Sequence, residues 1–420
     1  MNSQKNEAAK PEPLKPVSLW HMIKLGIGLI PHGHFEYISD TFISALARGF
    51  VGNASQVGYI QAFNPLFGFL VQPVIGWLGD HTWTRIGRRK PYLLFSLPWI
   101  LVAFIAMPLA PKLVPFVVAV VIYQFFVDMY AVSCSTMMPE TVPLQQRSTQ
   151  SAVSAIVGSA LAVCAMLFVA PLYDKNHLYP FAFAALITTA STAMLLFGIT
   201  EHYHGFKKRP ALYKAPAEVV KWAFENRNIR KLFLIILFGS YGNNSVGAFR
   251  ILFMSRTLGV SVGKAASIGF IGPLVGAATA VPLGYLADRY GRKNMMLFAN
   301  LVGVVATVIG LAAYSLNQMY FHFFVGAIGA TASAVSLYPL MTQFMPRDRI
   351  GTISGAIPLF YGSARLLAML TAGRIIDAFG ENYRVIWVIA LVCAIPCLAL
   401  VLSIDTSQDV KERNAKEVGG

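Results

Sequence analysis

The segments GWLGDHTWTRIGRRK at residues 76–90 and GYLADRYGRK at residues 284–293 are two copies of one pattern. Each is a charged interruption between long apolar runs. The matching residues are Gly76 with Gly284, Asp80 with Asp288, Gly87 with Gly291, and Arg88 with Arg292. About half of the 420-residue chain separates the copies. This spacing predicts two related halves, as in transporters built from parallel repeats.

The apolar runs on either side of these copies are long enough to cross a bilayer as helices. The chain is 56% hydrophobic and only 13% charged, whereas a soluble domain carries about a quarter charged residues. About 20 apolar residues suffice for one crossing. We predict an all-α membrane protein with twelve transmembrane helices in two pseudo-symmetric six-helix bundles. The predicted helices lie near 21–47, 55–79, 92–110, 113–138, 149–172, 178–199, 231–257, 263–287, 294–314, 318–344, 351–377 and 383–404.

The expected domains follow from these helices. They are an N-terminal tail at 1–20, a first bundle at 21–199, a linker at 200–230, a second bundle at 231–404 and a C-terminal tail at 405–420. The first tail is polar and rich in proline, without the short apolar region of a signal peptide. We therefore expect the first helix itself to direct insertion.

The basic residues indicate the topology. Lys and Arg number 34 against 19 Asp and Glu, a net charge of +15. They gather in alternate loops, including the opening tail, residues 207–231 and residues 289–293. Because cytoplasmic loops carry the excess of Lys and Arg, both termini are expected in the cytoplasm. The membrane itself stays open between the cell's cytoplasmic membrane and that of an internal organelle. The charge reflects topology, so we expect no nucleic-acid partner.

Other chemistries lack their motifs. No phosphate-binding loop, nucleophile elbow or zincin helix occurs, so we predict neither ATP-driven transport nor an enzyme, and no cofactor. The four cysteines lie inside predicted helices, where packing is the expected role: Cys134, Cys164, Cys393 and Cys397.

The doubled loop resembles the signature of the major facilitator superfamily, over essentially all of residues 20–404. The first copy, preceded by LVQP at 70–73 and followed by Lys90-Pro91, resembles the glycoside–cation and sucrose–proton symporters. The resemblance implies transport by alternating access. The sucrose transporters also place an aspartate in the fourth helix, as Asp128 is placed here. Their arginine further along that helix has no counterpart within residues 130–140.

The two loops are predicted to form a cytoplasmic gate. In the family, the aspartate matched by Asp80 meets the positive N-terminus of a helix in the other half. The simpler alternative is that basic residues merely hold the loop inside. The predicted gating residues are Gly76, Asp80, Arg85, Gly87, Arg88, Arg89, Gly284, Asp288, Gly291 and Arg292.

The first predicted helix carries the densest set of ionisable residues. His32, Glu36 and Asp40 are spaced i, i+4 and i+8, so they share one helix face. A charge at the bilayer centre costs about 2.5–3.5 kcal/mol on insertion scales, so this face should line the central cavity. We predict that Glu36 and Asp40, or else Asp128, carry the coupling cation, a proton or sodium.

Polar residues in other helices are expected to line the same cavity. Arg365 lies at the midpoint of its helix and needs an acidic partner. Asp128 is the favoured partner, with Glu36 and Asp40 as alternatives. The predicted cavity residues are His32, His34, Asn243, Asn244, Arg250, His322, Tyr361 and Arg365.

A divalent metal such as iron is a second hypothesis for this site. On an unbroken helix, His32 and His34 point about 200° apart and cannot reach one ion. A break at Pro31 or Gly33 would let them converge, with Glu36 nearby. The simpler interpretation is separate polar histidines in a wet cavity, with no metal.

These patterns predict a secondary active transporter of a small molecule, coupled to a cation, with proton-coupled symport of a saccharide as the leading hypothesis. Transport of a divalent metal or a small organic ion is the alternative. A non-transporting assembly factor is the third, although a scaffold has no need of charges inside the membrane. The lipid bilayer is the expected surrounding. The oligomeric state stays open, and a monomer is consistent with the pattern.

Overall fold

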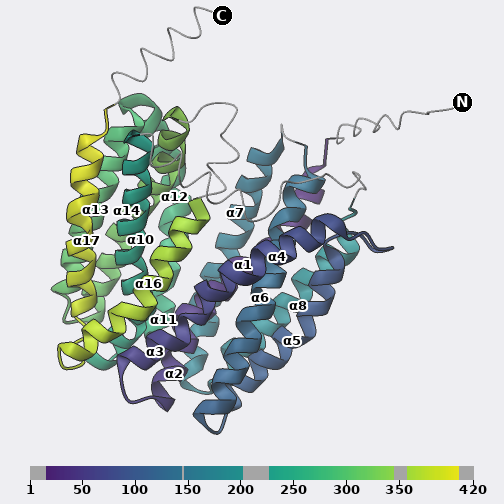
Figure 1. Ribbon diagram of the computed structural model, residues 1–420, viewed down its shortest axis with the longest axis horizontal. Helices are drawn as coiled ribbons and strands as arrows, with labels where there is room; N and C mark the ends of the chain where they lie inside the picture. The colour runs from purple at the N-terminus through teal and green to yellow at the C-terminus, as the bar shows by residue number, and fades with distance from the viewer. Residues whose placement is uncertain (1–15, 144–145, 202–226, 345–356, 406–420) are drawn as a thin grey trace, which may run out of the picture.

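The computed structural model describes residues 16–143, 146–201, 227–344 and 357–405 (Figure 1). The expected tails and most of the linker at 200–230 lie outside these residues, as does the start of the predicted helix at 351–377. In the described ranges, eleven helices are long and apolar enough to cross a membrane. The run from Leu19 to Phe50 adds a further passage, which contains the expected polar face. The prediction of an all-α membrane fold is confirmed.

The first half contains six helical passages. They are α1 (Leu19–Ile38) continued by the π-helix η1 (Ser39–Ile43) and α2 (Ser44–Phe50); α3 (Ala54–Gln61) with α4 (Phe63–His81); α5 (Lys90–Leu109); α6 (Leu113–Thr141); α7 (Arg147–Cys164) with η3 (Ala165–Val169) and η4 (Ala170–Asp174); and α8 (Leu178–Gly198). Pro31 lies inside α1, which runs unbroken past it to Ile38.

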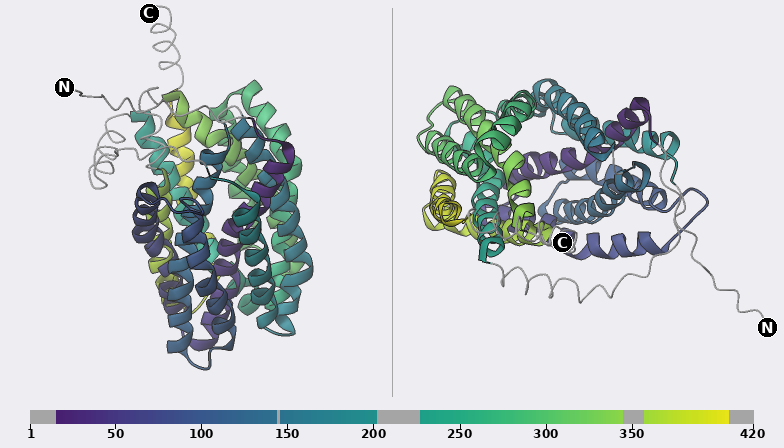
Figure 2. Two further views of the ribbon diagram at one scale, coloured as in Figure 1. Left: turned by 90° about the vertical axis from the view of Figure 1, so that its right-hand side faces the viewer. Right: turned by 90° about the horizontal axis from the view of Figure 1, so that it is seen from above.

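The second half repeats this pattern. It consists of α10 (Arg227–Leu252) with η5 (Phe253–Thr257); α11 (Val262–Ser267), η6 (Ile268–Phe270) and α12 (Ile271–Tyr290); α13 (Arg292–Leu311); α14 (Leu316–Phe344); α16 (Ile357–Ala378); and α17 (Val385–Ser403). Figure 2 shows the two halves from above as two groups of helices. The two expected six-helix bundles are therefore present.

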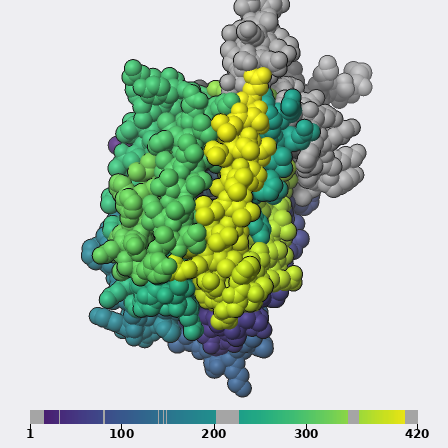
Figure 3. Space-filling model, turned by 90° about the vertical axis from the view of Figure 1, so that its left-hand side faces the viewer, coloured from purple at the N-terminus to yellow at the C-terminus, as the bar shows by residue number. Residues whose placement is uncertain are grey.

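Apolar residues fill both the interior and the outer surface. Phe35, Phe104 and Tyr123 form an aromatic cluster where α1, α5 and α6 meet. On the second half, α17 lies as a yellow strip between α13 and α10 (Figure 3). Large apolar side chains such as Phe197 and Val281 are exposed. Such a surface suits hydrocarbon rather than water.

The two halves meet most closely at one end. We call the end where α1 begins and α17 ends the termini side, and the opposite end the far side. Figure 1 shows the ribbons converging at the far side, where α3 packs against α16 and α11 packs against η4. Glycines allow this approach, because a Cβ atom at Gly58 or Gly373 would collide with backbone atoms of the other half. The far side is thus the tighter seal between the halves.

Candidate functional site

An ion-pair cluster joins the halves at the centre of the molecule. Arg365 of α16 forms an ion pair with Glu36 of α1, and its Nη2 donates to Oδ1 of Asp40 in η1 at 2.8 Å. Glu36 and Asp40 therefore share one face, as their spacing predicts. The prediction that Asp128 is the partner of Arg365 was wrong. Its Oδ1 instead accepts a hydrogen bond at 2.7 Å from Gln72, because Asp40 and Glu36 are the carboxylates that reach across to the second half.

A polar network surrounds the π-helical turn that holds Asp40. The amide of Gln124 donates to Oγ of Ser39 at 2.6 Å, and Gln61 donates to the carbonyl of Ser39 at 2.7 Å. Asn64 donates to Gln124. Such π-turns occur often at functional sites, since the extra residue shifts the side-chain register. Here the network fixes the segment from which Asp40 projects.

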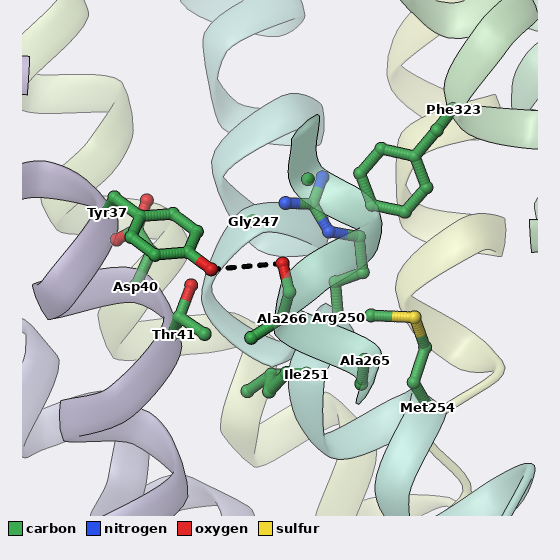
Figure 4. Close-up of a pocket in the computed structure, with 11 residues that line it drawn as sticks. Tyr37, Asp40, Thr41, Gly247, Arg250, Ile251, Met254, Ala265, Ala266 and Phe323 are labelled. Atoms are coloured by element: carbon green, nitrogen blue, oxygen red, sulfur yellow. Dashed lines mark hydrogen bonds between the residues drawn. The ribbon is translucent and has the colours of Figure 1, made fainter. Parts of the chain in front are cut away.

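A cavity lies beside this cluster, toward the far side (Figure 4). Tyr37, Asp40 and Thr41 enter from the first half, and Arg250 and Phe323 from the second. The space inside it that water can occupy is about 20 Å³, which is small: about 10–15 Å³ on this measure holds one water molecule. The hydroxyl of Tyr37 donates to the carbonyl of Ala266 at 2.9 Å. The full lining is Tyr37, Asp40, Thr41, Gly247, Arg250, Ile251, Met254, Ala265, Ala266, Gly269 and Phe323.

Several predicted cavity residues are not part of the lining of this pocket. His322 is buried within the second half, where its Nδ1 lies 2.7 Å from the carbonyl of Ala306 and its ring packs against Trp387. Its assignment to the cavity was therefore wrong. Asn244 donates to the carbonyl of Ser240 on its own helix. Asn243 and Tyr361 are exposed, and neither lines the cavity described above.

The histidines of the first helix do not converge through a helix break. The backbone stays helical through Pro31 and Gly33, so the geometry required for a shared ion is absent. The ring of His34 is enclosed, whereas the side chain of His32 lies outside the described set. Within the described residues, no group of three His, Cys, Asp or Glu side chains could hold a metal ion.

The first charged loop is anchored by two glutamates. Backbone N–H groups of Arg88, Arg89 and Lys90 donate to the carboxylate of Glu201 at 2.6, 2.9 and 3.0 Å. This carboxylate therefore occupies the positive N-terminus of α5. Glu140, at the end of α6, forms ion pairs with both Arg88 and Arg89. All these partners belong to the first half.

The gate prediction for Asp80 stays untested, since its side chain lies outside the described set. Arg85 is exposed, and Gly76 accepts at its carbonyl from Arg89. Gly87 has a positive φ of 125°. A Cβ atom there would lie 2.8 Å from the carboxyl carbon of Glu201, so this position requires glycine.

The second copy of the loop, at residues 284–293, makes weaker ionic contacts than the first. Arg292 lies 3.8 Å from Asp288 and donates to the carbonyl of Pro339. Gly291 has a φ of 92° with open space around it, and Gly284 is likewise uncrowded.

In both halves, a lysine at the end of the charged loop bonds to carbonyl groups near the end of the last helix of that half. Lys90 donates to the carbonyl of Leu196 near the end of α8, and Lys293 to those of Leu402 and Ile404 at the end of α17.

Carboxylates at helix starts hold the far side together. Asp377, at the end of α16, accepts from the N–H groups of Ala54 and Ser55 at 2.8 and 2.9 Å, where α3 begins. Asp174, at the end of η4, accepts from the N–H of Gly263 in α11 at 2.9 Å. Arg48 and Glu381 add an ion pair of 2.8 Å between the halves.

Sequence reasoning missed most of these anchors. Glu140 and Glu201 directly follow apolar runs, as Asp174 and Asp377 do, so each is an acidic residue at a helix end. An acidic residue at a helix end is thus the sequence feature that could have identified these anchors. Their partners are backbone N–H groups or residues far away in sequence, which no local pattern identifies.

The chain is similar to known transporters along its whole length. A family model described as MFS/sugar transport protein matches residues 25–404. The nucleoside transporter NupG has a TM-score of 0.71 at 12% identity, over 91% of this chain and 99% of that one. An autoinhibited POT family peptide transporter has a TM-score of 0.69 at 11% identity, over 91% and 96%.

Curated relatives match shorter stretches. The bacillibactin exporter of Bacillus subtilis (strain 168) is 26% identical over 33% of this chain and 37% of its own length. The niacin transporter NiaP of Acinetobacter baylyi is 30% identical over 27% of this chain and 25% of its own. The chain thus spans well under half the length of these two relatives. Because the family model matches nearly all of its residues, the chain belongs to the MFS/sugar transport protein family of the major facilitator superfamily, and it is a multi-pass integral membrane protein.

Proposed function

We propose that this protein is a secondary active transporter that moves a small polar solute together with a proton by alternating access. The basic loops support a cytoplasmic location for the termini side. The state described above is then sealed on the outer side by Asp377 and Asp174. Reorientation would require these contacts to open and the loops at 76–90 and 284–293 to approach the opposite half.

The observation that carries the proposal is the position of Arg365 between Glu36 and Asp40. One guanidinium faces two carboxylates, so the cluster has one excess negative charge when both are ionised. A proton on either carboxylate makes the cluster neutral, which is favourable in a medium of low dielectric constant.

The same proton would loosen the contact between the halves. Arg365 belongs to the second half and both carboxylates to the first, so a protonated carboxyl group is a weaker partner for the guanidinium. Proton binding and relative motion of the halves would then be linked. This linkage is what a proton-coupled transporter requires.

A saccharide remains the leading solute class, and its support is the family description together with the polar surroundings of the cavity. A small organic ion is the second class, favoured by the guanidinium of Arg250 in the cavity wall. Divalent metal transport has less support, since the helix break that would bring His32 and His34 together is absent.

The experiment begins with a thermal-shift screen of the purified protein against sugars, organic acids and divalent metals. The stabilising compound, radiolabelled, is then followed into proteoliposomes with and without an imposed pH gradient. Glu36→Gln and Asp40→Asn are the test variants, and Asp405→Asn, an exposed carboxylate just beyond the end of α17, is the control.

Neutralising the coupling carboxylate should abolish gradient-driven accumulation while sparing exchange of solute across an equilibrated membrane, because exchange needs no net proton movement. The control should accumulate solute normally. If both test variants still accumulate solute against its gradient, the Arg365 cluster does not couple transport, and Asp128 becomes the next residue to test.

A further inference from the structure

Arg250 is a cation in the cavity wall that no carboxylate of the described residues contacts directly. In the described part of the chain, its guanidinium has no carboxylate within ion-pair distance and no hydrogen-bond acceptor. Its nearest defined contact is the ring of Phe323, at 4.6 Å from the ring centroid. Every other arginine described near the interface between the halves has an acceptor: Arg48, Arg365 and Arg374.

The carboxylate that lines the same cavity, that of Asp40, already accepts a hydrogen bond from Arg365. Asp40 lines the same cavity as Arg250, but its Oδ1 is the acceptor for Arg365. The cavity therefore offers an incoming solute a cation with no carboxylate in direct contact. Asp40 acts on Arg250 only at longer range. A cationic solute would have to displace Arg365 from Asp40, whereas an anionic solute could bind Arg250 directly.

One side of Arg250 is not covered by a side chain of its own helix. Gly247 lies one helical turn before it and contributes no side chain. Even a Cβ atom built there would meet only Oδ2 of Asp40, at 3.8 Å. In Figure 4 the guanidinium lies beside Gly247, between Tyr37 and Phe323. The cavity receives residues from both halves, which is where a transporter's solute contacts the two repeats together.

We propose that Arg250 binds an anionic group of the transported solute, and specifically a carboxylate. A guanidinium presents two parallel N–H groups that match the two oxygens of a carboxylate. The bound carboxylate supplies a counter-charge in direct contact with Arg250, and Tyr37, from the first half, lines the same cavity. The solute is then an organic acid, a class that includes sugar acids. This inference rests on the proposed transport function and specifies its substrate.

The charges of the site agree with this assignment. With Glu36 and Asp40 sharing Arg365, one bound proton leaves that cluster neutral. Arg250 then contributes one positive charge, which one carboxylate cancels. The solute and the proton would thus enter together as a neutral load, consistent with symport of an acid with a proton.

The test measures equilibrium binding without any gradient. Purified protein is screened by thermal shift against small carboxylic acids, each paired with its own neutral amide: glucuronate with glucuronamide, lactate with lactamide, and benzoate with benzamide. At least one acid should raise the melting temperature while its amide does not. Arg250→Gln should weaken binding of that acid at least about tenfold, and Arg250→Lys should restore part of the affinity. Arg256→Gln, an exposed arginine on the same helical run, should bind as the parent does.

Two results would overturn the assignment. The first is that no acid stabilises the protein more than its amide. The second is that the preferred acid binds Arg250→Gln as tightly as it binds the parent, which would make Arg250 only a counter-charge for Asp40. Because no pH gradient is used, a failure here is distinct from a failure of proton coupling in the Glu36 and Asp40 variants.

Discussion

Asp174 and Asp377 occupy equivalent positions in the two halves, and each accepts hydrogen bonds from the start of a helix in the other half. Asp174 ends the fifth helical passage of the first half and caps α11, where the second passage of the second half begins. Asp377 ends the fifth passage of the second half and caps α3, where the second passage of the first half begins. The far-side seal is therefore symmetric about the repeat.

This symmetry predicts that the two caps act together on the conformational equilibrium. Asp377→Ala should weaken the seal by about 1 kcal/mol, the usual cost of replacing a helix cap by alanine. Such a loss changes the ratio of far-side-closed to far-side-open molecules about fivefold. Asp174→Ala should have an effect in the same direction. The double variant should shift the ratio further than either single change.

The measurement uses spin labels at Gly52→Cys and Phe379→Cys, both at exposed far-side positions of opposite halves, after replacement of the native cysteines. The distance distribution between the labels should gain a longer component in the Asp variants. Glu201→Gln, which changes a carboxylate on the termini side within one half, is the matched control. A distribution unchanged in the double variant would exclude the caps as a latch.

The Arg365 cluster predicts which acidic residues couple to the arginine. Arg365→Ala and Asp40→Ala should each destabilise the protein, and the double variant should lose less than the two losses combined, with a coupling energy of about 1–3 kcal/mol. The same cycle with Asp128→Ala should be close to additive, because Asp128 accepts from Gln72. Thermal unfolding in detergent reports both cycles. Strong coupling of Asp128 with additive behaviour of Asp40 would contradict the ion pairs described here.

Sequence patterns predicted the fold because each transmembrane helix must meet the requirements of the bilayer by itself: it must be apolar over its length, and its backbone groups must be hydrogen-bonded within the helix. Twenty consecutive apolar residues are a local property, so the helices and their repeat could be read directly from the chain. The shared face of Glu36 and Asp40 followed from helical periodicity in the same way. The π-turn at Ser39–Ile43 left that relationship intact, since both carboxylates still reach Arg365.

The partners of these residues could not be predicted, because they depend on how the two bundles dock. Asp128 and Asp40 are both acidic residues in membrane helices, and only their packing decides which reaches Arg365. His322 shows the same limit: its polar ring is accommodated by one backbone carbonyl, that of Ala306. A single hydrogen bond thus allows a histidine inside a packed bundle that sequence reasoning assigns to a cavity.

Glu140 provides a test of the termini-side loop. It lies between Arg88 and Arg89, and the side chain of Arg89 is only 3% exposed. Glu140→Gln removes the negative charge from this arrangement and should lower the free energy of unfolding by about 1–3 kcal/mol. Glu381→Gln removes the partner of Arg48 at a site 41% exposed, where an ion pair contributes at most about 1 kcal/mol. Equal losses in the two variants would show that burial does not strengthen the Glu140 contacts.

Gly87 and Gly291, the matched glycines of the two loops, both have a positive φ, so one substitution compares the loops of the halves. Gly87→Ala and Gly291→Ala both place an L-residue in a region where it is strained, at a cost of about 1–2 kcal/mol. Only at Gly87 does the new methyl group also collide with a carboxylate, that of Glu201, which the N-terminus of α5 holds in place. Gly87→Ala should therefore lower the melting temperature more than Gly291→Ala. Combining Gly87→Ala with Glu201→Ala should remove the collision but not the strain, so the further loss on adding Gly87→Ala should fall to that of Gly291→Ala. If Gly87→Ala destabilises equally with and without the Glu201 side chain, the carboxylate does not occupy the start of α5 as described, and the two loops are held by backbone conformation alone.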